Sequence, residues 1–161
     1  MTSYYANLGW SEKFGTNNSD NLYSVGNQIV WGLCGNDTLT TNPSPYDQTL
    51  IGGSGDDVIN LSAGSHTFSD DAKLATIETI NANASATTLD LTGQLEGFTI
   101  AGGAQGDNLT GGSGNDIITG GGGDDTLKGG AGNDTLNVDS GSDIITPVSY
   151  THLTLPTRLM V

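Results

Sequence analysis

The stretch that decides the fold is residues 102–146, which reads GGAQGDNLT GGSGNDIIT GGGGDDTLK GGAGNDTLN VDSGSDIIT. Five nine-residue units follow one another without a gap, and glycine fills the first two positions in four of them. The sixth position is always Asp and the eighth is always a large aliphatic residue. These residues are Asp107, Asp116, Asp125, Asp134 and Asp143, and Leu109, Ile118, Leu127, Leu136 and Ile145. The period predicts stacked repeats, because one unit alone cannot bury its apolar residue.

Each unit divides into a six-residue turn and a three-residue strand. Because side chains alternate across a strand, the eighth residue faces inward, while the seventh and ninth face solvent. Stacking the units about 4.8 Å apart lets each strand pair with the next coil and piles aliphatic side chains on one another. The pattern therefore predicts an all-β solenoid.

The six-residue turns are predicted to bind a metal ion. Glycine permits positive φ angles and close backbone approach, which bunches backbone carbonyls in the gap between stacked turns. The position-six Asp adds a carboxylate, and oxygen ligands suit Ca²⁺, whereas transition metals prefer His or Cys. The candidate ligands are the five position-six carboxylates, Asp57 further upstream, and the turn glycines Gly112, Gly114, Gly121, Gly123, Gly130 and Gly132.

The pattern Gly-Gly-x-Gly-x-Asp-x-aliphatic-x resembles the RTX nonapeptide, the hemolysin-type calcium-binding repeat. The resemblance implies that two units form one coil of a right-handed parallel β-roll, so that each unit lies above the unit two steps away. Several Ca²⁺ ions are then expected between Asp107 and Asp125, between Asp125 and Asp143, and between Asp116 and Asp134. Gln105 and the segment 138–140 replace expected glycines, so the site between Asp116 and Asp134 is the one that the sequence predicts most strongly.

Upstream copies of the unit are degenerate. Residues 52–60 are one full copy and residues 32–40 a partial one. Asp57 has no Asp in register two units away, and we expect it to stack towards Lys73 or its neighbours. Aliphatic or aromatic residues continue the nine-residue spacing, and we expect residues 70–101 to join the solenoid with metal-free turns. These positions are Leu50, Ile59, Phe68 and Ile77, and in a shifted phase Ala82, Leu91, Ile100 and Leu109.

The chain is thus divided into four parts: 1–41, an N-terminal cap with degenerate repeats; 42–101, degenerate coils; 102–146, the calcium-binding roll; and 147–161, a non-native tail. The tail is so assigned because residues 148–157 resemble a translated sequencing adapter. Trp10, Trp31, Tyr4 and Tyr5 are expected to cover the open end of the solenoid. His66 is expected in a turn, and Cys34 is read as incidental.

Composition narrows the class of protein. The chain has 161 residues, 25 of them Gly, and 18 Asp and Glu against 4 Lys and Arg, for a net charge of −14. Hydrophobic residues make up 34%, too few for a broad globular core. The charge argues against nucleic acid and anionic membranes as partners and favours cations. We find no apolar segment of membrane-spanning length, no ordinary secretory signal and no enzyme motif.

We therefore expect a non-enzymatic, calcium-binding RTX module of a larger extracellular or surface-exposed bacterial protein. The resemblance implies export by a type I secretion apparatus, with repeats that stay unfolded at low cytosolic calcium and fold outside the cell. Repulsion between stacked carboxylates and the entropy of glycine-rich turns agree with a metal-free chain that is largely unfolded. Two alternatives stay open: the spacer of a calcium-dependent adhesin or surface-layer protein, and the C-terminal part of a secreted protease, lipase or pore-forming toxin. The sequence sets no oligomeric state.

Overall fold

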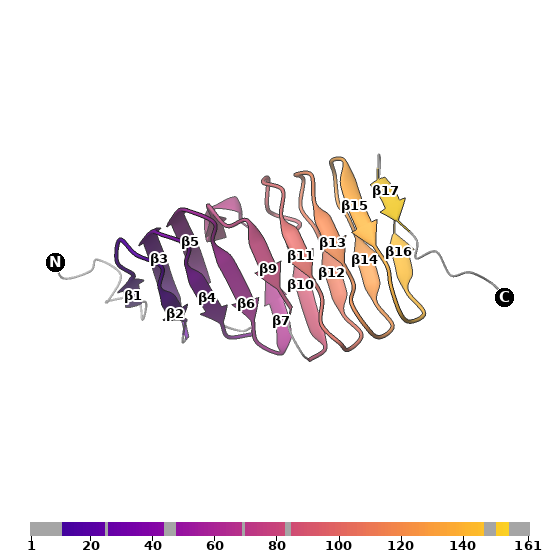
Figure 1. The fold of residues 1–161 in the computed structure, drawn as a ribbon, viewed down its shortest axis with the longest axis horizontal. Helices are drawn as coiled ribbons and strands as arrows, with labels where there is room; N and C mark the ends of the chain where they lie inside the picture. The colour runs from indigo at the N-terminus through magenta and orange to yellow at the C-terminus, as the bar shows by residue number, and fades with distance from the viewer. Residues whose placement is uncertain are drawn as a thin grey trace.

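The computed structural model describes residues 11–24, 26–43, 48–68, 70–82, 85–146 and 151–154. Short strands are stacked one after another along an elongated solenoid (Figure 1). All strand pairs in its sheets are parallel, so the expected all-β parallel β-roll is confirmed. Within these ranges the helical structure is one short 3-10 element, and no helix could cross a membrane.

Three sheets are wound from the chain. One sheet, which we call the common sheet, runs the length of the solenoid, and the other strand of each coil lies in an upstream or a downstream sheet. The common sheet contains β2 (Asn21–Tyr23), β4 (Thr38–Thr41), β6 (Val58–Leu61), β9 (Thr79–Asn81), β11 (Thr99–Ala101), β13 (Ile117–Thr119), β15 (Asp134–Asn137) and β17 (Thr151–Thr154). The upstream sheet contains β1 (Ser11–Phe14), β3 (Gln28–Cys34), β5 (Gln48–Ser54) and β8 (Leu74–Ala75). The downstream sheet contains β7 (Gly64–Thr67), β10 (Thr87–Asp90), β12 (Asn108–Thr110), β14 (Thr126–Lys128) and β16 (Ile144–Thr146).

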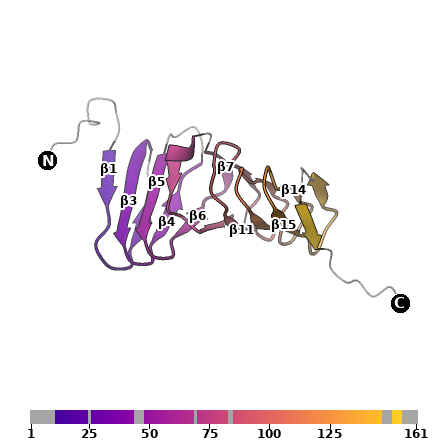
Figure 2. The same cartoon turned by 90° about the horizontal axis from the view of Figure 1, so that it is seen from above.

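The upstream sheet gives way to the downstream sheet in a single coil. Between β6 and β9 the chain forms β7, the 3-10 helix η2 (Asp71–Lys73) and β8, so this coil contributes to all three sheets. Seen from above, it lies in the middle of the solenoid (Figure 2). The carboxylate of Asp70 caps η2 by accepting the N–H of Ala72. In the register of the common sheet this coil has 21 residues, against 20 in the coil before it and 20 in the coil after it.

The core is one cluster of side chains between the facing sheets, with one inward column from each sheet. The eighth residues of the repeats, Leu109, Ile118, Leu127 and Leu136, are fully buried, and Ile145 is partly buried, as the alternation predicts. Upstream, the expected core positions 50, 59, 68, 77, 82, 91 and 100 are buried as well. The prediction that residues 70–101 join the solenoid is therefore confirmed at the level of burial and stacking.

The spacing between stacked residues differs along the solenoid. In the downstream repeats, equivalent residues are 18 apart, so each unit lies on the unit two steps away, as the resemblance implies. Upstream the spacing along the common sheet is 17 residues from Asp20 to Asp37, 20 from Asp37 to Asp57 and 21 from Asp57 to Glu78. Ile59 therefore pairs with Ile80, and the nine-residue spacing that links it to Ile77 does not give its stacking partner. Loops of different lengths between the degenerate coils account for the difference.

Two single-residue expectations are wrong. His66 is not in a turn: it lies on β7 opposite Leu89, is buried, and hydrogen-bonds the Ser62 carbonyl at 2.8 Å. Trp31 does not cover the end of the solenoid, because it lies on the second strand of the upstream sheet and stacks on Phe14 with ring centroids 6.3 Å apart. Trp10, Tyr4 and Tyr5 lie outside the described residues.

Both ends of the described chain are part of the roll. Residues 11–41, expected as a cap, form the strands β1 to β4 of the same sheets. At the other end β17 pairs in parallel with β15, so part of the stretch expected to be a non-native tail continues the common sheet. The rest of that tail lies outside the described residues.

Two adjacent isoleucines test the inward and outward assignment. Ile118 is fully buried, whereas Ile117 is 47% exposed. We expect Ile118→Ala to lower the free energy of unfolding by about 2–5 kcal/mol, through lost burial and a cavity. Ile117→Ala serves as the matched control and should cost well under about 1 kcal/mol. Denaturant unfolding in excess calcium measures both, and equal losses would contradict the fold.

Candidate calcium sites

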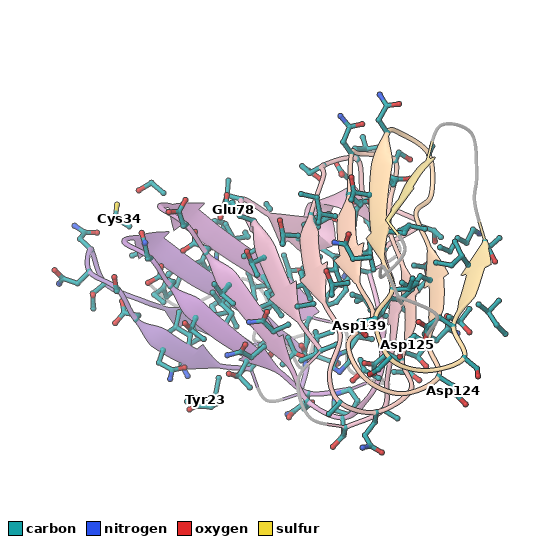
Figure 3. All side chains as sticks on the ribbon, turned by 45° about the vertical axis from the view of Figure 1, so that its right-hand side comes forward. Tyr23, Cys34, Glu78, Asp124, Asp125 and Asp139 are labelled. Carbon is teal, nitrogen blue, oxygen red and sulfur yellow. The ribbon has the colours of Figure 1, made fainter. Side chains whose placement is uncertain are left out.

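The turns of the roll gather along two edges of the solenoid. Turns 111–116 and 129–134 lead into the common sheet, and turns 102–107, 120–125 and 138–143 lead into the downstream sheet. Asp124, Asp125 and Asp139 lie together on one edge, away from Glu78 and Cys34 on the other (Figure 3). Each edge therefore presents its own series of stacked turns.

The position-six carboxylates form columns along these edges. In each predicted pair, the backbone N–H of the earlier Asp donates to Oδ1 of the later one. The distances are 2.8 Å from Asp107 to Asp125, 3.0 Å from Asp116 to Asp134 and 3.0 Å from Asp125 to Asp143. All but Asp143 are buried. The structure thus brings together all three pairs that the sequence predicts, with their carboxylates turned into the fold.

In the first turn of each column, the backbone of the turn donates a hydrogen bond to the carboxylate of the same turn. The N–H of Gly103 donates to Oδ2 of Asp107 at 2.7 Å, and the N–H of Gly112 donates to Oδ2 of Asp116 at 2.9 Å. With Oδ1 bonded to the preceding coil, at the N–H of Thr87 or Phe98, both oxygens have a partner. These two turns therefore hold together through hydrogen bonds within the protein.

The second turn of each column leaves one carboxylate oxygen without a partner. Oδ2 of Asp125 and Oδ2 of Asp134 are buried and receive no hydrogen bond. In these turns positions two and four are glycines in the left-handed region. Their φ angles are +95° and +107° at Gly121 and Gly123, and +106° and +113° at Gly130 and Gly132. A buried, unpartnered carboxylate oxygen is costly, and a cation beside it removes that cost.

Backbone carbonyls complete the oxygen lining between stacked turns. The carbonyl of Gly112 lies against Gly130, and the carbonyl of Gly114 lies against Gly132, so closely that a Cβ would collide with either oxygen. Gly112 and Gly114 themselves are not in the left-handed region and are needed for close approach to residues 94 and 96. Among the described residues no group of three or more His, Cys, Asp or Glu side chains forms a metal site. A cation here therefore depends on carbonyls as well as carboxylates, which is the donor set that Ca²⁺ accepts.

Burial raises the pKa of two carboxylates of the columns, Asp116 and Asp125. Burial raises the pKa of Asp116 to about 6 from 3.8, with a smaller contribution from the charge of Asp134, against hydrogen bonds from Phe98 and Gly112. Burial also raises the pKa of Asp125, reinforced by Asp143, Asp107 and Asp139. Metal binding must then compete with protons for these carboxylates.

A third series of acidic residues lies upstream and corrects one expectation. Asp57 stacks on Asp37 and Glu78, not on Lys73: the N–H of Asp37 donates to Asp57, and the N–H of Asp57 donates to Glu78, each at 2.7 Å. Asp20 continues the series through its N–H to Asp37. A fixed spacing of 18 residues does not group Asp20, Asp37 and Glu78 with Asp57, because successive members of this set are 17, 20 and 21 residues apart. An acid-x-aliphatic pattern before each strand is the signal that could have found them: Asp20-x-Leu22, Asp37-x-Leu39, Asp57-x-Ile59 and Glu78-x-Ile80.

The stacked turns and their acidic columns define a structural metal-binding β-roll. The family model for the RTX calcium-binding nonapeptide repeat (4 copies) matches residues 44–65, 99–127 and 110–145. Over these residues, which are less than half of the chain, the sequence matches RTX calcium-binding repeats, which form a structural and not a catalytic module and are typical of secreted bacterial proteins. No curated protein and no solved structure matches the chain.

Two neighbouring glycines test the geometry of the turn. Gly121 has φ +95°, and a Cβ there would collide with the Gly103 carbonyl, whereas a Cβ on Gly122 would lie 3.6 Å from its nearest neighbour. Gly121→Ala should therefore destabilise the calcium-loaded roll by about 1–3 kcal/mol. Gly122→Ala should be nearly neutral. Thermal unfolding in calcium compares the two, and similar midpoints would argue against this turn conformation.

The raised pKa of Asp116 makes the metal-free fold sensitive to pH. Because the folded pKa of about 6 exceeds the ordinary 3.8, the folded state holds extra protons between these values, and its stability rises as pH falls through them. In EDTA, acidification from about pH 7 to about pH 5 should increase the β signal in circular dichroism. Asp116→Asn should reduce this response, since it removes the titrating group. A β signal that falls over the same window would contradict the assignment.

Proposed function

We propose that this chain is a calcium-binding module of a larger secreted bacterial protein, in which Ca²⁺ bound between stacked RTX turns holds the roll together. The observation that supports this most directly is the pair of buried, unpartnered oxygens, Oδ2 of Asp125 and Oδ2 of Asp134. Each belongs to a turn with two left-handed glycines, next to carbonyls of the preceding turn. The proposed ligands are the carboxylates of Asp107, Asp116, Asp125, Asp134 and Asp143 with carbonyls of the same turns.

Calcium binding and folding are coupled in this proposal. A column of buried carboxylates without counter-ions opposes folding, as the raised pKa values of Asp116 and Asp125 indicate. A hard cation in each gap between stacked turns neutralises these charges and is coordinated by the carbonyl oxygens. Since no preformed site exists in an unfolded chain, the binding free energy becomes folding free energy. The residues of the site therefore act as structural calcium ligands.

Coupled folding also accounts for the proposed location and partner. Extracellular calcium modules bind in the range of about 10⁻⁴–10⁻³ M, so such a roll is metal-free in the cytosol and loaded outside. An unfolded, strongly acidic chain suits passage through a type I secretion apparatus, the export partner that the RTX resemblance implies. The net charge of −14 supports cations as ligands rather than nucleic acid.

A calcium titration of the full chain, followed by far-UV circular dichroism, tests the proposal. We expect β signal to appear by about 10 mM Ca²⁺, above the range of extracellular modules. Asp116→Asn with Asp134→Asn should bind fewer ions, by about one per chain, because Asn keeps the hydrogen bond from the earlier coil but loses the charge. Isothermal titration calorimetry counts the ions.

The matched control is Asp124→Asn with Asp139→Asn, which removes the same charge from two exposed positions. This variant should bind as many ions as the unmodified chain. A chain that gains no β signal by about 10 mM Ca²⁺ would sink the calcium function. A stoichiometry unchanged by the Asp116 and Asp134 substitutions would instead reject that pair as ligands.

A further inference from the structure

The upstream turns carry a separate acidic series, which we call the upstream ladder: Asp20, Asp37, Asp57 and Glu78. Each precedes a strand of the common sheet, namely β2, β4, β6 and β9. Successive members are linked by hydrogen bonds of 2.7 Å from a backbone N–H to the carboxylate of the next coil. The family match over 44–65 includes Asp57 but none of the other three.

As in the downstream columns, the first carboxylate of the upstream ladder is hydrogen-bonded within its own turn and later ones have an oxygen without a partner. Its first turn satisfies its own carboxylate, because the N–H and hydroxyl of Thr16 both donate to Oδ2 of Asp20. Asp37 and Asp57 are 1% and 0% exposed, and Oδ2 of each is buried without a partner. Buried carboxylate oxygens without a hydrogen-bond partner therefore occur in the upstream turns as well as in the downstream columns.

The backbone explains why these two oxygens lack a donor. At Asp57, the N–H of Gly53 is taken by the hydroxyl of Thr76 at 2.6 Å, so it does not reach the carboxylate as Gly103 does downstream. At Asp37, the corresponding position is Leu33, which has φ +84°, a conformation that non-glycine residues rarely adopt. Both turns thus keep the conformation of the later downstream turns although one of them lacks the glycine.

Carbonyls line the gaps of the ladder as they do downstream. The carbonyl of Leu33 lies against Gly53, that of Gly35 against Gly55, and that of Thr76 against Gly52. The last gap is unlike a repeat pair, because the full turn 52–57 faces the shorter segment 76–78 with Glu78 in place of Asp. The donor set is again carboxylate and carbonyl oxygen, which suits Ca²⁺.

A buried phenyl ring separates the ladder from the downstream repeats. In the common sheet the position that follows Glu78 is Phe98, and the position after that is Asp116. Phe98 is 3% exposed, and its N–H donates to Asp116 at 2.8 Å. Phe98 therefore supplies no carboxylate between Glu78 on one side and Asp116 on the other. The acidic series on this edge is therefore divided into two blocks.

We infer that residues 15–78 form a second calcium-binding block, with Asp37, Asp57 and Glu78 as its carboxylate ligands, which loads independently of the repeats at 102–146. This inference rests on the proposed calcium function of the turns. Phe98 and the metal-free coils around it form the boundary, where buried Gln94 donates to the carbonyls of Phe68 and Asp70 in place of a cation.

Trp31 reports on the upstream block alone. It precedes Gly32 in the first turn with an unpartnered carboxylate and stacks on Phe14 of the neighbouring strand. Because the chain has two tryptophans, Trp10→Phe leaves Trp31 as the only tryptophan, which can be excited selectively over the tyrosines. In this background, Ca²⁺ is titrated while Trp31 fluorescence and far-UV circular dichroism are recorded on the same samples.

We expect a calcium-dependent change in Trp31 fluorescence that is lost, or shifted at least about tenfold in midpoint, by Asp37→Asn with Asp57→Asn. The same variant should keep the dichroism change of the downstream repeats, which shows that it still folds there. Asp56→Asn, at an exposed neighbour of Asp57, should leave the fluorescence unchanged. Asp116→Asn with Asp134→Asn should leave the Trp31 transition in place.

Each contrary result overturns a different claim. If dichroism responds to calcium but Trp31 does not, the upstream block does not bind while the proposed function stands. If the Trp31 transition moves with Asp116 and Asp134 in the way it moves with Asp37 and Asp57, the two blocks are not independent. If neither signal responds, both the inference and the proposed function fail.

Discussion

The hydrogen bond from a backbone N–H to the acidic side chain of the next coil is the interaction on which this solenoid depends. It recurs at Asp37, Asp57 and Glu78 upstream and at the repeat aspartates downstream, with lengths from 2.7 to 3.0 Å. One carboxylate oxygen joins two coils, and in the later turns the other oxygen is buried without a partner. The hydrogen bond that aligns successive coils therefore also buries a carboxylate. Because that buried charge needs a cation, the interaction that makes the stacking regular also makes the fold depend on a cation.

Glycine is needed in these turns for two different reasons. At Gly121 and Gly130 the backbone is left-handed, while at Gly112 and Gly114 a neighbouring backbone leaves no space for a Cβ. Leu33 shows that the left-handed conformation belongs to the stacked position rather than to glycine itself, since it has φ +84° where the equivalent residue of the next coil is Gly53. Stacking therefore holds a residue in a conformation that its own preference opposes.

The middle of the solenoid shows what the same architecture requires where acidic turns are absent. The coils around β7 to β11 bury Phe68, Leu91 and Phe98, and buried Gln94 satisfies two carbonyls through its amide. Apolar side chains and neutral hydrogen bonds replace carboxylates there, so burial carries no uncompensated charge. This section, whose described residues include no buried carboxylate, separates two sections that do bury carboxylates, and a continuous backbone stack does not imply a continuous series of metal sites.

The nine-residue period by itself determined the all-β solenoid and the inward aliphatics, because an exact repeat lets equivalent residues stack on one another. The pairing of Asp107, Asp116, Asp125, Asp134 and Asp143 also needed the resemblance to the RTX repeat, which implies two units in each coil. The period could not give the pairing of Asp57, since the loops between degenerate coils change the spacing from 18 to 20 or 21 residues. Only the tertiary structure placed His66 in the core, Trp31 on an outer face and Phe98 within the acidic series. It also decided which carboxylate oxygens lack a partner, because that depends on whether the backbone of each turn directs an N–H at its own Asp, and stacking on the preceding coil sets that direction.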